Sequence, residues 1–181
     1  MIDGMMECWN QLFLGCKEGS RFEFPNKHLE KSALQWVSVL LSFAGHENGR
    51  ELIGQKAKQI TGAVLNWIQE PDHSDALLIA TISLLEALVT FYFCQEAFCK
   101  TIHIVRKTTE RSSDDLDKED MTVLSLRESF GNFCMEVLKC LDRKFLDSIL
   151  IKCCNDKSIK FFWKVVEERE PDLVLPSDKS R

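Results

Sequence analysis

The sequence has few residues that interrupt regular backbone structure. Its 181 residues include only 4 prolines and 8 glycines. A many-stranded sheet sandwich needs frequent turns, and turns are built largely from glycine, proline, asparagine and aspartate. The hydrophobic content of 45% and the charged content of 28% are those of an ordinary globular protein. We therefore expect an all-α fold made of long helices.

An excess of positive charge is also missing. The formal net charge is −5 and the sequence pI is about 5.4. Proteins that bind nucleic acid neutralise phosphates with lysine and arginine, so an acidic chain is a poor candidate for that class. We expect proteins as partners, and neither nucleic acid nor a small-molecule substrate.

The first residues lack the pattern of a secretory leader. No basic segment precedes an apolar run in residues 1–9. The chain has 8 cysteines, and four of them, Cys94, Cys99, Cys134 and Cys140, lie within apolar helical stretches, where free cysteine acts as a small hydrophobic residue. We expect an intracellular protein of a reducing compartment, cytoplasm or nucleus.

Apolar residues recur at spacings of three and four almost throughout the chain, which is the helical period. This pattern predicts helices over residues 5–16, 27–44, 50–69, 76–94, 96–109, 122–141, 144–154 and 158–168. Residues 110–121 contain almost no apolar side chain and are expected to form a solvated loop. Ser74 or Asp75 is expected to cap the helix that follows.

These segments predict three parts. Residues 1–25 are expected to form an N-terminal helix and a linker, residues 26–170 a helical repeat domain, and residues 171–181 a disordered tail. The chain is expected to be either a complete protein or a piece of a longer array.

A repeat supports this division. The motif is a hydrophobic helix, a break, a charged residue beside an apolar pair, and a second amphipathic helix. Aligning Leu52, Phe98 and Phe145 gives spacings of 46 and 47 residues. Because a single helix pair cannot bury both of its apolar faces, such units stack and share a continuous core.

The segments 40–41, 48–53 and 76–89 carry a resemblance to the armadillo/HEAT superfamily of α-solenoids, whose repeats span roughly 40–47 residues. The likeness covers residues 29–162 and implies about three degenerate repeats. It further implies a non-catalytic scaffold or adaptor that binds peptides or helices along a concave face. The third repeat departs from the pattern because it lacks the glycine break.

The run at residues 76–94 is long enough to cross a bilayer. Glu86 lies at its centre, where a carboxylate is costly in lipid, and Thr81 and Ser83 reduce its hydrophobicity further. We expect a buried core helix, with a membrane-anchored helical protein as the alternative.

Metal and catalytic signatures are weak. Cys94 and Cys99 with His103, or Cys134 and Cys140 with residues 153–154, do not have the ligand spacing of structural zinc sites. Nucleotide-binding, nucleophile-elbow and metalloprotease motifs are absent from the sequence. We expect no metal, no cofactor and no enzymatic activity; an enzyme whose site is assembled from dispersed residues is the other alternative.

The repeat suggests which side chains contact a partner. If the second helix of each pair lines the concave side, the exposed positions are expected to include Lys56, Gln59, Asn66, Lys100, His103, Arg106 and Lys107. The last four belong to a basic stripe that suits an acidic peptide or helix, although a solvated helix face explains the same pattern. The large aromatic residues Trp36, Trp67, Phe91 and Trp163 are expected in the core.

Overall fold

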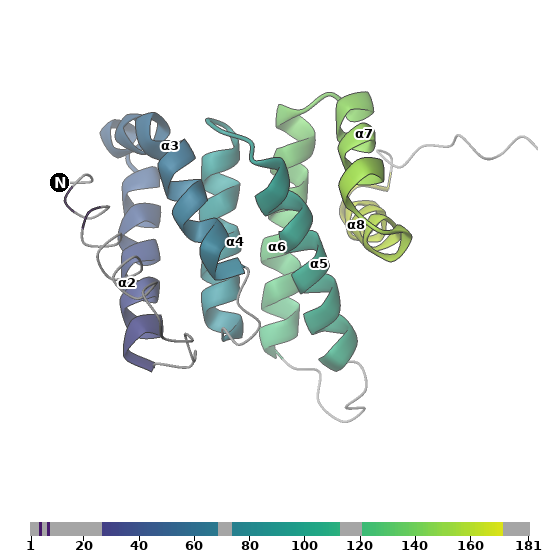
Figure 1. Ribbon diagram of the computed structural model, residues 1–181, viewed down its shortest axis with the longest axis horizontal. Helices are drawn as coiled ribbons and strands as arrows, with labels where there is room; N and C mark the ends of the chain where they lie inside the picture. The colour runs from purple at the N-terminus through teal and green to yellow at the C-terminus, as the bar shows by residue number, and fades with distance from the viewer. Residues whose placement is uncertain (1–3, 5–6, 8–26, 69–73, 113–120, 172–181) are drawn as a thin grey trace, which may run out of the picture. The chain divides into compact units, whose positions relative to one another are not determined.

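A computed structural model describes residues 4, 7, 27–68, 74–112 and 121–171. The described residues form seven helices and no strand (Figure 1), which confirms the all-α class. They divide into two compact units, one ending at Cys94 and the other beginning at Gln95. Apart from Glu7, the expected helix at 5–16 lies outside the described residues, as do the acidic part of the loop at 113–120 and the tail from residue 172.

The first unit contains three helices, α2 (Lys27–Ala44), α3 (Glu47–Ile68) and α4 (Asp75–Val89). Helix α2 packs against both α3 and α4, and α3 also packs against α4. Helix α3 buries one stripe of its surface, which consists of Ile53 and the residues four, seven and eleven positions after it. Helix α4 buries residues on most of its circumference. The core side chains of α3 and α4 are Ile53, Ala57, Ile60, Val64, Leu77, Leu78, Ile82, Leu84, Leu85, Leu88 and Val89.

Helix α4 confirms that the apolar run is a core element. Eight of its side chains are buried, as expected for a helix that is apolar on nearly all sides. Within the part of the chain that the structure describes, no helix combines the length and the hydropathy needed to cross a membrane.

The link between α2 and α3 is shorter than expected. Helix α3 begins at Glu47 and not at residue 50, so Gly49 lies inside its first turn. A Cβ atom at Gly49 would stand 2.3 Å from the carbonyl oxygen of Phe43. This glycine therefore permits close approach of two backbones, whereas the sequence pattern had indicated a break.

Helix α4 ends earlier than expected, at Val89, and the chain turns with the amides of Phe91 and Tyr92 both donating to Leu88 O at 2.9 Å. The core assignment of Phe91 is wrong, because the turn leaves this side chain 41% exposed. Its ring covers Gly54 and lies 5.6 Å from Arg50 Cζ. Trp36 is buried as expected, Trp163 is half-buried, and the side chain of Trp67 lies outside the described residues.

The second unit contains α5 (Gln95–Ser112), α6 (Met121–Cys140), α7 (Arg143–Cys153) and α8 (Asp156–Arg169). Helix α5 packs against the other three helices, and α8 also packs against α6 and α7. Phe98 lies at the centre, with its ring 6.0 Å from that of Phe133 and 5.6 Å from that of Phe162. These edge-on aromatic pairs form the core of the unit.

Among the described residues, side-chain caps are seen at the starts of α4, α7 and α8. Ser74 Oγ accepts from the Leu77 amide at 3.3 Å and donates to a carboxylate oxygen of Glu30, so the expected cap of α4 is confirmed. Asp142 caps α7 and Asn155 caps α8. Each cap satisfies a backbone N–H group that has no partner within its own helix.

The aligned repeat positions do not share one environment. Phe98 is fully buried, whereas Leu52 is 46% exposed and Phe145 is 53% exposed. The neighbours Ile53 and Leu146 are fully buried in their place. The buried positions are therefore 45 and 48 residues apart, a less regular period than the alignment indicated.

Candidate protein-binding surface

The three contact residues expected on α3 belong to the first unit. Lys56 is half-buried and Gln59, three residues further on, is exposed. The side chain of Asn66 lies outside the described residues. The other four expected contacts lie on α5, so the structure assigns the predicted set to two separate units.

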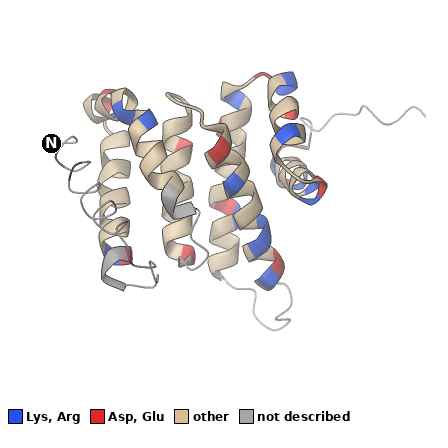
Figure 2. Cartoon of the chain, in the orientation of Figure 1, with Lys and Arg blue, Asp and Glu red and all other residues tan. Residues whose placement is uncertain are grey.

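Helix α5 carries basic residues along its length (Figure 2). Lys100, His103, Lys107 and Arg111 follow one another at spacings of three, four and four, which places them along one side of the helix. Residues 100–107 include no acidic residue. Lys100, His103, Lys107 and Arg111 therefore form the basic stripe of α5, and no acidic residue interrupts it between positions 100 and 107.

Arg106 does not belong to that exposed stripe, and its assignment as an exposed contact is wrong. It is 7% exposed because position 106 follows the buried residues Ile102 and Val105 on the inner face of α5. Its Nη1 atom donates to both carboxylate oxygens of Glu110, at 2.7 and 2.6 Å. The guanidinium group of Arg106 is thus paired with the Glu110 carboxylate of its own helix.

Two members of the stripe contribute less positive charge than the sequence indicated, because one is paired with a carboxylate and the other is neutral. Lys100 Nζ lies 2.7 Å from Glu96 Oε1, one helical turn earlier. Burial lowers the pKa of His103, and the positive charges of Lys107 and Arg106 lower it further. The His103 imidazole is therefore neutral at neutral pH. Lys107 and Arg111 are the exposed cations of the stripe.

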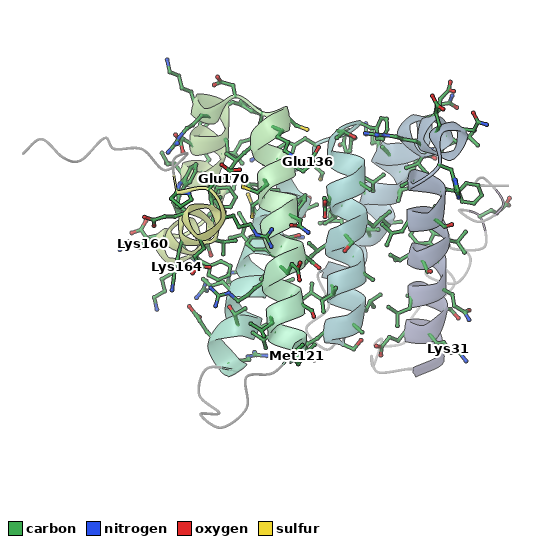
Figure 3. All side chains as sticks on the ribbon, turned by 180° about the vertical axis from the view of Figure 1, so that it is seen from behind. Lys31, Met121, Glu136, Lys160, Lys164 and Glu170 are labelled. Carbon is green, nitrogen blue, oxygen red and sulfur yellow. The ribbon has the colours of Figure 1, made fainter. Side chains whose placement is uncertain are left out.

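A second cationic stripe lies on α8. Lys157, Lys160 and Lys164 are all exposed, and the segment from 157 to 164 contains no acidic residue. Figure 3 shows Lys160 and Lys164 projecting outward from the helix. These residues are not among the contacts predicted from the sequence, although their spacing of three and four is a sufficient signal for one helix face.

An aromatic side chain accompanies the α8 lysines. Trp163 is half-buried and lies one turn from Lys160 on the helix surface. Arg143 of α7 holds its guanidinium carbon 4.4 Å from the Trp163 ring centroid, in a cation–π contact. The partly exposed indole of Trp163 therefore contacts a basic side chain of α7 and lies on the same helix as the α8 lysines.

Apolar side chains are also exposed on this unit. On α7, Phe145 is 53% exposed and Ile151 is 73% exposed; on α6, Met121 is 73% exposed and Leu124 is 42% exposed. Aromatic, methionine and arginine side chains are enriched in protein–protein interfaces. The second unit thus offers both apolar anchors and positive charge.

The described residues do not form a metal-binding cluster. They include no group of three or more histidine, cysteine, aspartate or glutamate side chains that could hold a metal ion. His46 is exposed, and His103 lies near the charges of Lys107, Arg106 and Glu110. His28 and His73 have no described side chain.

Comparison of the chain with protein-family models, with curated proteins and with solved structures finds no match.

Proposed function

We propose that this chain is a non-catalytic scaffold or adaptor, built on an armadillo/HEAT-like helical repeat, that binds an acidic peptide or helix through its second unit. The observation that carries the proposal is the grouping of exposed cations on α5 and α8 in a chain whose net charge is −5. The proposed contact residues on α5 are Lys100, His103, Lys107 and Arg111, and Lys157, Lys160 and Lys164 of α8 are added to them.

Charge grouping supports a binding role more strongly than single charges would. An isolated surface ion pair contributes only about 0–1 kcal/mol. Several like charges on one helix face produce a local potential that attracts and orients an oppositely charged partner. Lys157, Lys160 and Lys164 form such a face, which Asp156 and Glu167 flank at its two ends.

Exposed apolar residues can supply binding free energy that surface charges alone do not. Most of the free energy of a protein interface comes from a few well-buried anchors. Phe145 and Ile151 of α7 are exposed candidates for that role. An amphipathic segment with acidic and apolar residues fits this combination, since helices bind in grooves through their apolar face.

The repeat-like arrangement agrees with a scaffold role. In the first unit each helix packs against the next one, and in the second unit α5 packs against α6 and α7 packs against α8, as the helix pairs of stacked repeats do. The buried residues Ile53, Phe98 and Leu146 recur at intervals close to one armadillo or HEAT repeat.

Affinity purification of the tagged full-length chain, followed by mass spectrometry, tests the proposal with two charge-reversal variants. One variant changes Lys157, Lys160 and Lys164 to glutamate; the other changes Lys107 and Arg111. The matched control changes Lys31 and Lys58, which are exposed lysines of the first unit. Circular dichroism confirms that each variant is folded.

We expect a defined set of proteins to be retained by the wild type and the control and lost from at least one charge-reversed variant. Binding of a recovered partner should also weaken as salt is raised, since the charges are exposed. Partners retained by both variants would contradict the cationic surface. If the folded wild type retains no specific partner, the scaffold function itself is wrong.

A further inference from the structure

Arg143, the first residue of α7, lies over the indole ring of Trp163 on α8. Its guanidinium carbon is 4.4 Å from the ring centroid, and the two helices pack against each other. Arg143 is exposed and Trp163 is half-buried, so solvent reaches both side chains. The pair is therefore a cation–π contact at the surface of the second unit.

The core of the second unit fixes the position of the indole. Phe162, the residue before Trp163, is fully buried, and its ring lies edge-on to the indole with the two centroids 5.0 Å apart. Protein interiors are closely packed, so a buried ring of this kind has little room to move. The indole therefore supports Arg143 from a fixed position. A side chain that is already held in place loses less conformational entropy when it binds a ligand.

The carboxylate that accompanies Arg143 on its own helix is not in close contact with it. Arg143 Nε lies 4.0 Å from Asp147 Oδ2, which is longer than a hydrogen bond. Arg127 of the same unit, by comparison, holds Nη2 2.8 Å from Glu168 Oε2. An aromatic ring contacts the face of a guanidinium, whereas a carboxylate binds at its edge, where the N–H donors lie. The cation–π contact of Arg143 is therefore compatible with a carboxylate bound at the edge.

Further positive charge lies close to Trp163 along α8. Lys160 precedes it by three residues and Lys164 follows it directly, and both lysines are exposed (Figure 3). Residues 143–147 and 157–168 together contain five basic and three acidic residues. The charge of these two segments is therefore positive in a chain whose net charge is −5. Such a surface attracts acidic groups.

We propose that Arg143, held on Trp163, binds a glutamate or aspartate side chain of the partner and is the specific anchor of the acidic-peptide surface. The inference rests on the proposed function, since it assigns one contact within that surface. The planar fork of a guanidinium matches the two oxygens of a carboxylate, so Arg143 recognises the shape of the group as well as its charge. Lys160 and Lys164 attract the partner over a longer range and increase its rate of association.

The indole contributes to binding in a second way. It covers part of the Arg143 guanidinium and keeps water away from that part. An interaction between opposite charges is stronger where water is excluded. Replacement of Arg143 by lysine keeps the charge but removes the planar fork, and replacement of Trp163 by leucine keeps an apolar side chain but removes the aromatic ring. These two substitutions therefore separate the proposed contact from net charge.

Titration of the full-length chain with a fluorescein-labelled synthetic peptide, followed by fluorescence anisotropy, tests the inference. The peptide is an amphipathic helix of glutamate and leucine with an amidated C-terminus, so its only carboxylates are side chains. The control peptide has glutamine in place of glutamate. The variants are Arg143→Lys and Trp163→Leu, and the matched control is Arg111→Lys, which makes the same exchange at an exposed arginine of α5. Circular dichroism verifies that each variant is folded.

We expect Arg143→Lys and Trp163→Leu to bind the glutamate peptide about tenfold more weakly than the wild type, as the loss of one hydrogen bond between charged groups predicts. Arg111→Lys should stay within about twofold, because it keeps an exposed charge. In nuclear magnetic resonance spectra, the indole N–H signal that is absent from Trp163→Leu should shift when the glutamate peptide is added to the wild type. The signal of Trp36, which is buried in the first unit, should not shift.

Two results would overturn the inference and leave the proposed function in place. One is an Arg143→Lys variant that binds as tightly as the wild type while charge reversal of Lys157, Lys160 and Lys164 abolishes binding. The other is an indole signal of Trp163 that does not shift when the wild type is saturated with the glutamate peptide. If the folded wild type binds the glutamate peptide no better than the glutamine peptide, both the anchor and the acidic partner are wrong. Should Trp163→Leu fail to fold, the exposed substitution Arg143→Lys decides the outcome alone.

Discussion

At the scale of single residues, two glycines of α3 stand in opposite surroundings. Gly62 is exposed, and a Cβ atom there would meet nothing within 4 Å. Gly49 is buried, and its Cβ would stand 2.3 Å from the backbone oxygen of Phe43. Alanine is favoured over glycine in a helix interior by about 0.8–1 kcal/mol.

We therefore expect Gly62→Ala to raise the free energy of unfolding by roughly 0.5–1 kcal/mol, and Gly49→Ala to lower it by roughly 1–3 kcal/mol. The backbone of Phe43 cannot move aside as a flexible side chain would. Urea titration followed by circular dichroism measures both changes. Equal effects of the two substitutions would contradict the close approach at Gly49.

His103 gives the stability of the chain a pH dependence. Burial, and then the charges of Lys107 and Arg106, hold its pKa in the folded state below the ordinary value of 6.5. As pH falls from 6.5 towards the folded pKa, the unfolded chain takes up a proton that the folded chain does not. Stability is therefore unaffected by this group above the ordinary value and is lost progressively below it.

We expect His103→Gln to lose less stability than the wild type when the buffer changes from about pH 7.5 to about pH 5.5, the range in which histidine titrates. Urea unfolding at both values measures the difference. An identical loss in the two proteins would show that His103 does not contribute.

At the scale of the element, α7 depends on its ends more than the longer helices do. It has 11 residues, and helices shorter than about 12–15 residues are marginal without tertiary support. Asp142 accepts hydrogen bonds from the amides of Lys144 and Phe145 at 2.9 and 3.3 Å. This cap fixes the start of the helix that carries Cys153 at its other end.

We expect Asp142→Ala to lower the free energy of unfolding by about 1 kcal/mol, and Asp142→Asn to change it little, since asparagine caps helices as well as aspartate does. Thermal unfolding monitored by circular dichroism compares the two. If both variants lose the same stability, the role of Asp142 is electrostatic and does not come from the cap.

At the scale of the whole molecule, the two compact units have separate sets of core residues. Phe162 is fully buried in the second unit and contacts the rings of Phe98 and Trp163. Removing a buried phenylalanine side chain costs about 3–5 kcal/mol. Phe145, on α7 of the same unit, is 53% exposed and provides the matched control.

We expect Phe162→Ala to reduce hydrogen-exchange protection in α5–α8 while α2–α4 keep theirs. Phe145→Ala should stay within about 0.5 kcal/mol of the wild type, as surface substitutions usually do. Amide exchange followed by mass spectrometry resolves the two sets of helices. An equal loss of protection in α2–α4 would mean that the chain unfolds as one cooperative unit.

The all-α class and most helix positions could be predicted from the sequence alone, because helical periodicity and capping are local properties. The range of α2 is the expected one, and α5 to α8 begin within two residues of their expected starts. The run at residues 76–94 was correctly interpreted as a core element for the same reason. Its composition and the position of Glu86 at its centre can be read from the run alone, without knowledge of its neighbours in space.

Tertiary structure decided which side chains those helices expose. Arg106 is buried since α5 turns that face towards the interior of its unit, and Phe91 is exposed since α4 ends before reaching it. Periodicity places residues on a face but does not say which neighbour covers it. The hydrogen bond from Gln95 to Cys153 is of the same kind, because contacts between residues 58 positions apart arise only when separate helices pack.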